Sequence, residues 1–211
     1  FCIEKDINKI LYASSSSVYS DTDKGKFCEH KTSLKPKSKY GKSKHENEIH
    51  ASELIKSFDL SMVGLRFFSV YGPFGRPDMS ILRFVHWIIN EEKVQVFGDG
   101  EQRRSFTYVK DVVDALLKMS GLEKSHTFNV GSNMTVSLND VIKLIEEYSG
   151  KSANIENLER AYKDPDVVRP DLENIKKIIG WEPTTKIEEG VEKTVAWYKK
   201  NEEYLKDLVY L

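Results

Sequence analysis

The feature that most constrains the fold is an alternation of short apolar runs with longer segments of helical periodicity. Residues 9–15, KILYASS, form a compact apolar run that ends in small residues, a pattern typical of a buried strand. Residues 38–58 then show helical spacing, and Ser38 can cap the start of that helix. The apolar positions of this helix are Ile49, Leu54, Ile55 and Phe58. Alternating strands and helices build a parallel sheet with helices on its faces, so the sequence predicts an α/β fold.

The alternation continues toward the C-terminus. Further strands are expected at 61–72, 93–98, 105–109 and 126–132. Further helices are expected at 80–90, 110–121, 137–150 and 186–208. The spacing becomes less regular from about residue 74, which predicts a smaller lobe packed against the sheet.

Composition limits the partners and the cellular environment that we expect for the protein. Lys and Arg number 32 against 33 Asp and Glu, so no basic excess points to nucleic acid as a partner. No apolar run approaches the roughly 20 residues that a membrane-spanning helix needs, so we expect no membrane partner. Cys2 and Cys28 have neither metal-binding nor redox spacing, and we expect reduced thiols in a cytoplasmic protein.

Tyr40 and Lys44, in the segment YGKSK, are the first candidates for chemistry. A separation of four places both side chains on one face of a helix. A tyrosine acts as a base only when its phenolate is stabilised, which a neighbouring ammonium can do. The alternative is a solvated helix start, since lysines are frequent here and the chain has ten tyrosines. The helix macrodipole disfavours cations at this end, which favours a specific task for Lys44.

A serine run precedes this pair, in the segment YASSSSVYS (12–20). The run begins where the first expected strand ends, and ligands of parallel α/β sheets bind beyond the carboxyl ends of strands. Ser15 at a strand end and the Tyr40–Lys44 pair on the following helix together form a constellation suited to hydride and proton transfer. The alternative is a run of filler residues without a function.

Six segments, in this order and spacing, resemble one known family. They are YASSSSVYS (12–20), YGKSK (40–44), GLRFFSVYGPFGRPDM (64–79), VFGDGEQRRSFTYVKDVVDAL (96–116), NVG (129–131) and IGWEPTTKIEEGVEKTVAWY (179–198). Together they resemble the extended short-chain dehydrogenase/reductase family, and within it the nucleotide-sugar epimerases and dehydratases. The similarity is greatest to UDP-glucuronate 4-epimerase-like enzymes, and it runs from residue 1 to about residue 200.

This resemblance implies a domain organisation and a set of ligands. Residues 1–73 would be the C-terminal half of an NAD-binding Rossmann domain, to which segments around 105–132 return. Residues 74–211 would mainly form a nucleotide-sugar-binding lobe and C-terminal helices. The implied cofactor is NAD and the implied substrate is a UDP-sugar. The full-length protein would be a homodimer, joined by a four-helix bundle that includes the helix with Tyr40.

The resemblance also assigns site residues. Tyr40 would be the catalytic base, Lys44 would hold the nicotinamide ribose and favour the phenolate, and Ser15 would hydrogen-bond the sugar 4-hydroxyl. The implied cofactor contacts are Ala13, Ser14, Tyr40, Lys44, Phe67 and Val70. The implied substrate contacts are Ser15, Ser16, Ser17, Ser69, Arg76, Val96, Phe97, Arg104 and Arg169.

Two serines help to choose among the reactions of this family. Dehydratases of the family carry Asp-Glu after the catalytic hydroxyl residue, and decarboxylases usually carry a Glu two positions before the following tyrosine. This chain has Ser16 and Ser17 there, which are poor proton carriers. The resemblance therefore implies 4-epimerisation through a 4-keto sugar. Arg76 can hold a uronate carboxylate, or it can form a surface ion pair.

The sequence is also consistent with two other hypotheses. The chain can be a truncated, non-catalytic nucleotide-sugar-binding module. It can also catalyse another reaction of the family, such as UDP-glucuronate decarboxylation or dTDP-glucose 4,6-dehydration.

The chain departs from the family pattern at several positions. It begins with Phe1 and has no glycine before Gly25, so the Gly-rich turn that seats a cofactor pyrophosphate is missing. We expect a piece of a longer protein, which binds NAD poorly unless another segment supplies that half. Ser20 stands where Gly is usual, and Ser105 where Asp is usual. An arginine expected near Asp164 is out of register; Arg160 or Arg169 can replace it.

Overall fold

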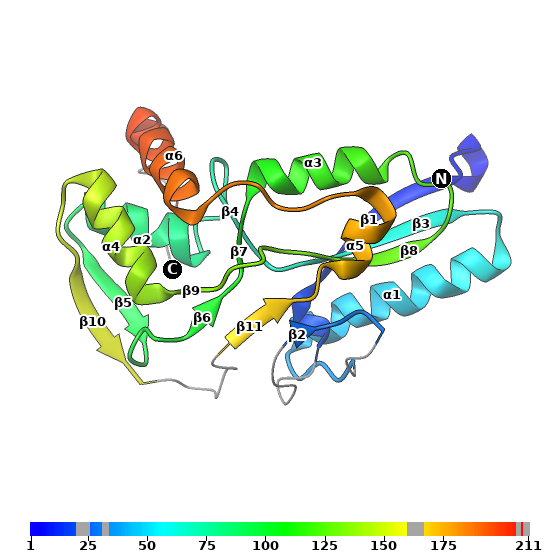
Figure 1. Ribbon diagram of the computed structural model, residues 1–211, viewed down its shortest axis with the longest axis horizontal. Coiled ribbons are helices and arrows are strands. Elements are labelled where there is room, and N and C mark those ends of the chain that lie inside the picture. Colours follow the sequence, from blue (N-terminus) through cyan, green and yellow to red (C-terminus); the bar gives the residue numbers. More distant parts are fainter. Residues whose placement is uncertain (20–25, 31–33, 160–166, 206–207, 209–211) are drawn as a thin grey trace.

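A three-stranded parallel sheet forms one half of the computed structural model, which describes residues 1–19, 26–30, 34–159, 167–205 and 208. Its strands are β1 (Lys9–Ser15), β3 (Ser61–Phe67) and β8 (His126–Val130), in the order β1-β3-β8. Helix α1 (Lys39–Ser57) covers one face, and helices α3 (Val109–Met119) and α5 (Glu173–Ile179) cover the other (Figure 1). This confirms the α/β fold with a parallel sheet.

The sheet is held by apolar residues that alternate along its central strand. Val63 and Leu65 of β3 are buried, and they pack with Phe128 of β8 and with Ala115 and Met119 of α3. The register pairs Lys9 through Ser15 of β1 with Ser61 through Phe67 of β3, so both strands end at the same level. The carboxyl ends of these two strands therefore form one edge, which faces the rest of the molecule (Figure 1).

A second group of elements lies beyond that edge. Its helices are α2 (Ser80–Ile89), α4 (Leu138–Ser149), α6 (Ile187–Lys200) and α7 (Glu202–Leu205), beside strands β5 (Lys93–Phe97) and β10 (Asn154–Leu158). Buried side chains such as Phe84, Ile145, Val191 and Tyr198 form its apolar core. Figure 1 shows these helices at the end of the molecule opposite the N-terminus.

Short strands connect the two groups. Strand β4 (Ser69–Tyr71) pairs in parallel with β7 (Phe106–Tyr108). A second small sheet has the order β2 (Lys26–Phe27), β11 (Val167–Pro170), β6 (Arg103–Arg104) and β9 (Val136–Ser137). Two 3-10 helices, η1 (Ile3–Lys5) and η2 (Ser16–Val18), lie at either end of β1.

Local sequence signals placed several helix starts correctly. Ser38 caps α1, because its hydroxyl oxygen accepts a hydrogen bond from the Gly41 N–H at 2.9 Å. Ser137 caps α4 in the same way, with the Asp140 N–H at 3.1 Å. Among the described residues, no helix is long and apolar enough to cross a membrane.

Two expectations were wrong in detail, and several short strands were missed. The strand expected at 61–72 is two strands in different sheets: β3 pairs with β1 and β8, whereas β4 pairs with β7. The helix expected at 186–208 stops at Lys200, and α7 begins after Asn201. The strands β2, β6, β9, β10 and β11 were not anticipated.

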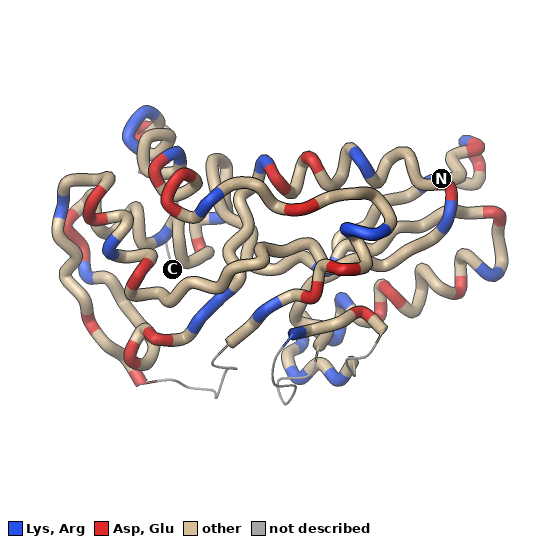
Figure 2. Tube along the Cα trace, in the orientation of Figure 1, with Lys and Arg blue, Asp and Glu red and all other residues tan. Residues whose placement is uncertain are grey.

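Charges are distributed without one dominant sign. Figure 2 shows basic and acidic positions interspersed along most of the chain. Exposed lysines gather at the N-terminal end of α1, namely Lys35, Lys37, Lys39 and Lys42. This end of α1 lies beside the carboxyl end of β1.

Candidate active site

One cavity gathers most of the residues that the sequence singled out. It has a volume of about 740 Å³ and lies at the carboxyl ends of β1 and β3, beside the loop that follows β4. The expected site residues that line it are Ala13, Ser14, Ser15, Ser16, Ser17, Tyr40, Phe67, Ser69, Val70 and Arg76. They come from four separate segments, so the fold rather than the sequence brings them together.

The serine run changes direction within this cavity. Ser15 is the last residue of β1, and its hydroxyl oxygen accepts a hydrogen bond from the Ser17 N–H at 3.1 Å, which caps η2. Ser14 and Ser15 are buried, whereas Ser17 is exposed. A serine hydroxyl that accepts from a backbone N–H still has its own proton to donate. Ser15 can therefore hydrogen-bond a ligand oxygen from a fixed position.

Tyr40 and Lys44 lie one helical turn apart on α1, as expected. Tyr40 is 51% exposed, and the Lys44 ammonium lies 5.8 Å from the centre of its ring. The ammonium also donates a hydrogen bond to the Ala13 carbonyl at 3.1 Å. This bond ties Lys44 to the end of β1 and keeps its ammonium beside the Tyr40 ring.

Gly41 allows α1 to begin directly against the serine run, and sequence reasoning missed it. A Cβ atom at this position would lie 2.3 Å from the Ser17 carbonyl oxygen and 3.0 Å from Pro36 Cβ. The neighbouring Tyr40 therefore reaches the cavity because residue 41 has no side chain. A glycine inside a helix, next to a candidate base, was the sequence signal for this contact.

Glu48 and Arg66 form a buried ion pair beneath the serine run, and they too were missed. The Arg66 guanidinium contacts both carboxylate oxygens of Glu48, at 2.7 and 2.8 Å. Glu48 Oε1 also accepts a hydrogen bond from the Ser14 hydroxyl at 2.5 Å. A charged residue within the apolar run GLRFF was the signal for this pair.

Arg76 lies at the mouth of the cavity with a partner of its own. Its guanidinium donates to both carboxylate oxygens of Asp78, at 2.5 and 3.0 Å. The hydrogen bond from Arg76 lowers the pKa of Asp78, which remains a carboxylate. The surface ion pair considered from the sequence is therefore present in this structure.

The expected nucleotide contacts lie outside this cavity. Val96 is buried in the apolar core of the second group, so its side chain is withdrawn from any ligand, whereas Phe97 is 46% exposed. Arg104 on β6 pairs in register with Val168 on β11, and Arg169 is the next residue of that strand. The other proposed replacement, Arg160, lies outside the described residues.

Ser105, which departs from the family pattern, has a structural role. Its hydroxyl donates to the Ser132 carbonyl at 3.0 Å and accepts from the Ser132 N–H at 2.8 Å. Its side chain is buried, and the two bonds join the start of β7 to the loop after β8. The serine therefore satisfies both backbone groups of Ser132.

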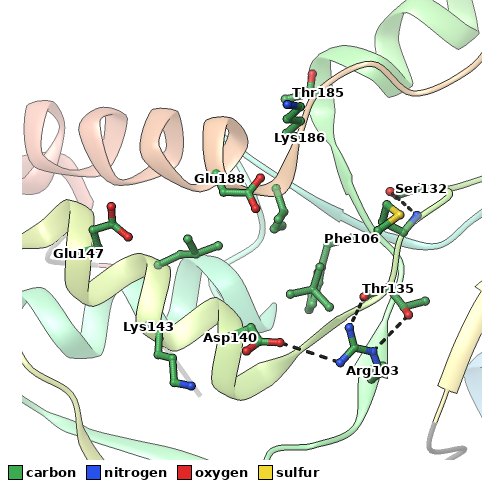
Figure 3. Close-up of a pocket in the computed structure, with 14 residues that line it drawn as sticks. Arg103, Phe106, Ser132, Thr135, Asp140, Lys143, Glu147, Thr185, Lys186 and Glu188 are labelled. Carbon is green, nitrogen blue, oxygen red and sulfur yellow. Dashed lines mark hydrogen bonds and ion pairs between the residues drawn. The ribbon is translucent and has the colours of Figure 1, made fainter.

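A second cavity, of about 600 Å³, contains none of the expected site residues (Figure 3). It lies between α4, the start of α6 and the strands β6 and β9. Arg103 lies at its rim, where its guanidinium donates to the Thr135 carbonyl at 2.7 Å (Figure 3). Both acidic and basic side chains line this cavity, among them Asp140, Lys143 and Glu188.

A family model and several known proteins match this chain. The model described as NAD dependent epimerase/dehydratase family matches residues 1–131. A UDP-glucuronate 4-epimerase of Thermodesulfobacterium geofontis is 37% identical over 206 residues, which is 96% of this chain and 62% of that protein. An uncharacterized protein of Methanocaldococcus jannaschii is 38% identical over 203 residues, with 95% and 62% covered. The chain thus spans about three fifths of the length of these curated relatives.

Solved structures agree with the family match. The UDP-glucuronic acid 4-epimerase from Bacillus cereus, solved with UDP-glucuronic acid and NAD, superimposes with a TM-score of 0.85 at 30% identity. The superposition covers 92% of this chain and 62% of that one. MoeE5 in complex with UDP-glucuronic acid and NAD gives a TM-score of 0.89 at 32% identity, covering 95% of this chain and 68% of that one.

Proposed function

We propose, from the premise that this chain belongs to the NAD-dependent epimerase/dehydratase family, that the whole protein is an NAD-dependent 4-epimerase of a UDP-sugar. The observation that carries the proposal is the single cavity that contains Ser15 and Tyr40, with Lys44 directly behind Tyr40. UDP-glucuronate is the proposed substrate and UDP-galacturonate the proposed product. The relatives and solved structures named for UDP-glucuronate support this choice.

The cavity fits the nicotinamide end of NAD. Tyr40 can offer its hydroxyl to the ribose, and Phe67 and Val70 can pack against the ring. Lys44 does not line the cavity, but its ammonium lies at the Ala13 carbonyl at the cavity's edge, from which it can reach the ribose. These residues contain no Gly-rich turn ahead of β1, since no glycine precedes Gly25. We therefore expect the 211 residues alone to bind NAD weakly, and the whole protein to bind it well.

Proton transfer is the task of this chain's own residues. The Tyr40 phenolate accepts the proton of the sugar 4-hydroxyl, while Ser15 hydrogen-bonds the same oxygen and Lys44 stabilises the negative charge of Tyr40. Bound NAD would supply an acceptor and donor of the C4 hydride. Rotation of the keto sugar in the pocket would present its opposite face for reduction, and Tyr40 would return its proton to the oxygen. All atoms of the substrate are thus conserved in the product.

The neighbouring serines disfavour the other reactions of the family. Elimination of water and directed decarboxylation both benefit from a further acid or base beside the sugar. Ser16 and Ser17 line the cavity next to Ser15, and neither hydroxyl ionises near neutral pH, so both are poor acids and bases. The keto sugar is therefore expected to be reduced again rather than to lose a group.

Recognition of a uronate is assigned to Arg76. Its guanidinium already holds one carboxylate, that of Asp78, in a two-oxygen arrangement. A uronate carboxylate has the same shape and charge, so it can take the place of Asp78 or share the guanidinium with it. Arg104 is proposed to bind the diphosphate.

Dimerisation of the whole protein is proposed to use α1. Its apolar side chains Ile49 and Leu54, and Phe58 directly after it, are 38–46% exposed. Exposed apolar side chains on a helix can contribute to a helix-to-helix interface. We also place the protein in the cytoplasm, where the thiols of Cys2 and Cys28 stay reduced.

Incubation of the whole protein with UDP-glucuronate and NAD tests the proposal. NMR spectroscopy of the products is expected to show UDP-galacturonate. A decarboxylated pentose or a 4-keto-6-deoxy sugar as the only product would overturn the assignment of the reaction.

The rival function is a nucleotide-sugar-binding module without activity. Calorimetry on the 211 residues is expected to detect UDP binding and weak NAD binding. Tight NAD binding by these residues contradicts the proposed division of the cofactor site. UDP binding by an inactive whole protein supports the module instead.

A further inference from the structure

Arg66 is a buried cation in the central strand of the sheet, and it divides its donors between two partners. Its side chain is 5% exposed. Nε and Nη2 donate to the two carboxylate oxygens of Glu48, and Nη1 donates to the Tyr19 hydroxyl at 2.9 Å. The guanidinium also lies 4.9 Å from the centre of the Tyr19 ring. Its planar fork is therefore fixed in both distance and orientation.

These two partners hold the two ends of the serine run. Glu48 accepts the hydroxyl of Ser14, the residue directly before Ser15. Tyr19 directly follows η2, so its hydroxyl anchors the other end of the run to the same guanidinium. The residues between the anchors are Ser15, Ser16, Ser17 and Val18, and the three serines line the cavity.

The same contacts also attach the helix of the Tyr–Lys pair. Glu48 follows Lys44 by one helical turn on α1, and its side chain is 9% exposed. The bond from Ser14 to Glu48 therefore connects the end of β1 to the helix that carries Tyr40. Arg66 lies on β3, so one guanidinium links three elements that meet at the cavity.

Tyr19 extends the network to a fourth element. Burial raises the pKa of Tyr19 to about 12, so its hydroxyl stays protonated near neutrality and donates to Asn129 Oδ1 at 2.6 Å. Asn129 lies on β8 and donates in turn to the Phe27 carbonyl at 2.7 Å. Each polar group around Arg66 thus has a partner, as a buried network requires.

We propose that Arg66 is a positioning residue that clamps both ends of the serine run and sets the Ser15 hydroxyl relative to Tyr40. Stability alone does not explain a buried ion pair, because well-packed apolar residues of similar volume are often as stable. Geometry does explain it, because one planar group with five donors fixes Glu48 and Tyr19 at once. The effect on turnover rests on the proposed function, whereas the effect on the serine run does not.

Amide hydrogen exchange on the 211 residues tests, without any substrate, whether Arg66 fixes both ends of the serine run; this arrangement is called the clamp below. The reporters are the Ser17 N–H, bonded to Ser15 Oγ, and the Tyr19 N–H, bonded to the Ser16 carbonyl. Arg66→Met is expected to speed exchange at both by about tenfold or more, because it removes charge-assisted hydrogen bonds from both anchors. Ser14→Ala and Tyr19→Phe each release one anchor and are expected to speed exchange less.

Thr194→Val is the matched control. Thr194 is fully buried in α6, where its hydroxyl donates to the Gly190 carbonyl at 2.7 Å. The variant also loses one buried hydrogen bond, yet it is expected to leave the two reporters unchanged. Unchanged reporters in Arg66→Met would overturn the clamp. If Arg66→Met does not fold, Ser14→Ala and Tyr19→Phe decide: the clamp fails if both leave the reporters at wild-type rates.

Kinetics of the whole enzyme test the catalytic consequence. Arg66→Lys keeps the charge but lacks the fork, and it is expected to lower kcat by about 100-fold with little change in KM. An increase in KM with an unchanged kcat would overturn the positioning role. A wild-type protein without epimerase activity refutes the proposed function, while the exchange measurement still judges the clamp.

Discussion

Gly41→Ala is expected to disrupt the site through a single added methyl group. The new Cβ would lie 2.3 Å from the Ser17 carbonyl oxygen, whereas ordinary contact begins near 3.4 Å. Either η2 or the start of α1 must therefore retreat by about 1 Å, a displacement that can lower turnover by about 100-fold. The substitution thus moves Tyr40 and the serine run apart without removing any catalytic group.

Two opposing terms decide the effect of Gly41→Ala on stability. Alanine is favoured over glycine inside a helix by about 1 kcal/mol. Overpacking against a backbone oxygen costs about 1–3 kcal/mol, and Pro36 and Ser38 leave the methyl group no other space. The clash is expected to win, with a net loss of about 1 kcal/mol in the free energy of unfolding, or roughly 3 °C in Tm.

The assays separate the local effect from general damage. Thermal unfolding of the 211 residues measures Tm, and turnover of the whole enzyme with UDP-glucuronate measures kcat. Gly121→Ala is the control, because a Cβ there meets nothing closer than the Lys118 carbonyl at 3.7 Å. A Gly41→Ala variant with wild-type kcat and unchanged Tm would refute the close contact between α1 and the serine run.

Further predictions concern the hydroxyls and charges of the cavity and its surroundings. Ser15→Ala is expected to lower kcat by about 100-fold in assays of the whole enzyme, since it removes a hydrogen bond to the reacting oxygen. Near-normal turnover would show that Ser15 has no role in the reaction. Arg76→Ala is expected to raise KM for UDP-glucuronate by about tenfold and to leave KM for UDP-glucose nearly unchanged. An equal increase of KM for both sugars would show that Arg76 does not recognise the uronate carboxylate. Asp78→Asn is expected to leave uronate binding intact, because Arg76 keeps its charge. The pKa of Tyr19 is raised to about 12 by burial, so the folded state resists ionisation that the unfolded state accepts from about pH 10. Chemical denaturation is therefore expected to show the stabilising effect in full below pH 10 and its loss between pH 10 and 12, with a smaller loss in Tyr19→Phe.

The exposed apolar residues of α1 show where helical periodicity stops being informative. Spacing alone placed Ile49, Leu54 and Phe58 on one helix, and the helix is present. Their exposure was not predictable, because periodicity does not say whether an apolar side chain meets a sheet or remains exposed. The location of a helix follows from nearby residues, whereas its burial depends on distant ones.

Sequence reasoning placed the candidate site residues correctly where their positions depend on neighbours in the chain. The spacing of Tyr40 and Lys44 fixes one helix face, and the end of an apolar run fixes the position of Ser15. Both follow from local geometry. The fold then determined that these segments, together with residues 67–76, line one cavity.

The sequence by itself determined the parallel α/β architecture, the helix starts at Ser38 and Ser137, and the position of Tyr40 and Lys44 one turn apart on one helix. Only the tertiary structure decided that residues 61–72 split at Phe68, that Val96 is buried and that Arg66 holds both Glu48 and Tyr19. The reason is the range of the interactions. Periodicity and capping act within a few residues, whereas a buried guanidinium finds its partners across strands and helices that the chain order does not bring together.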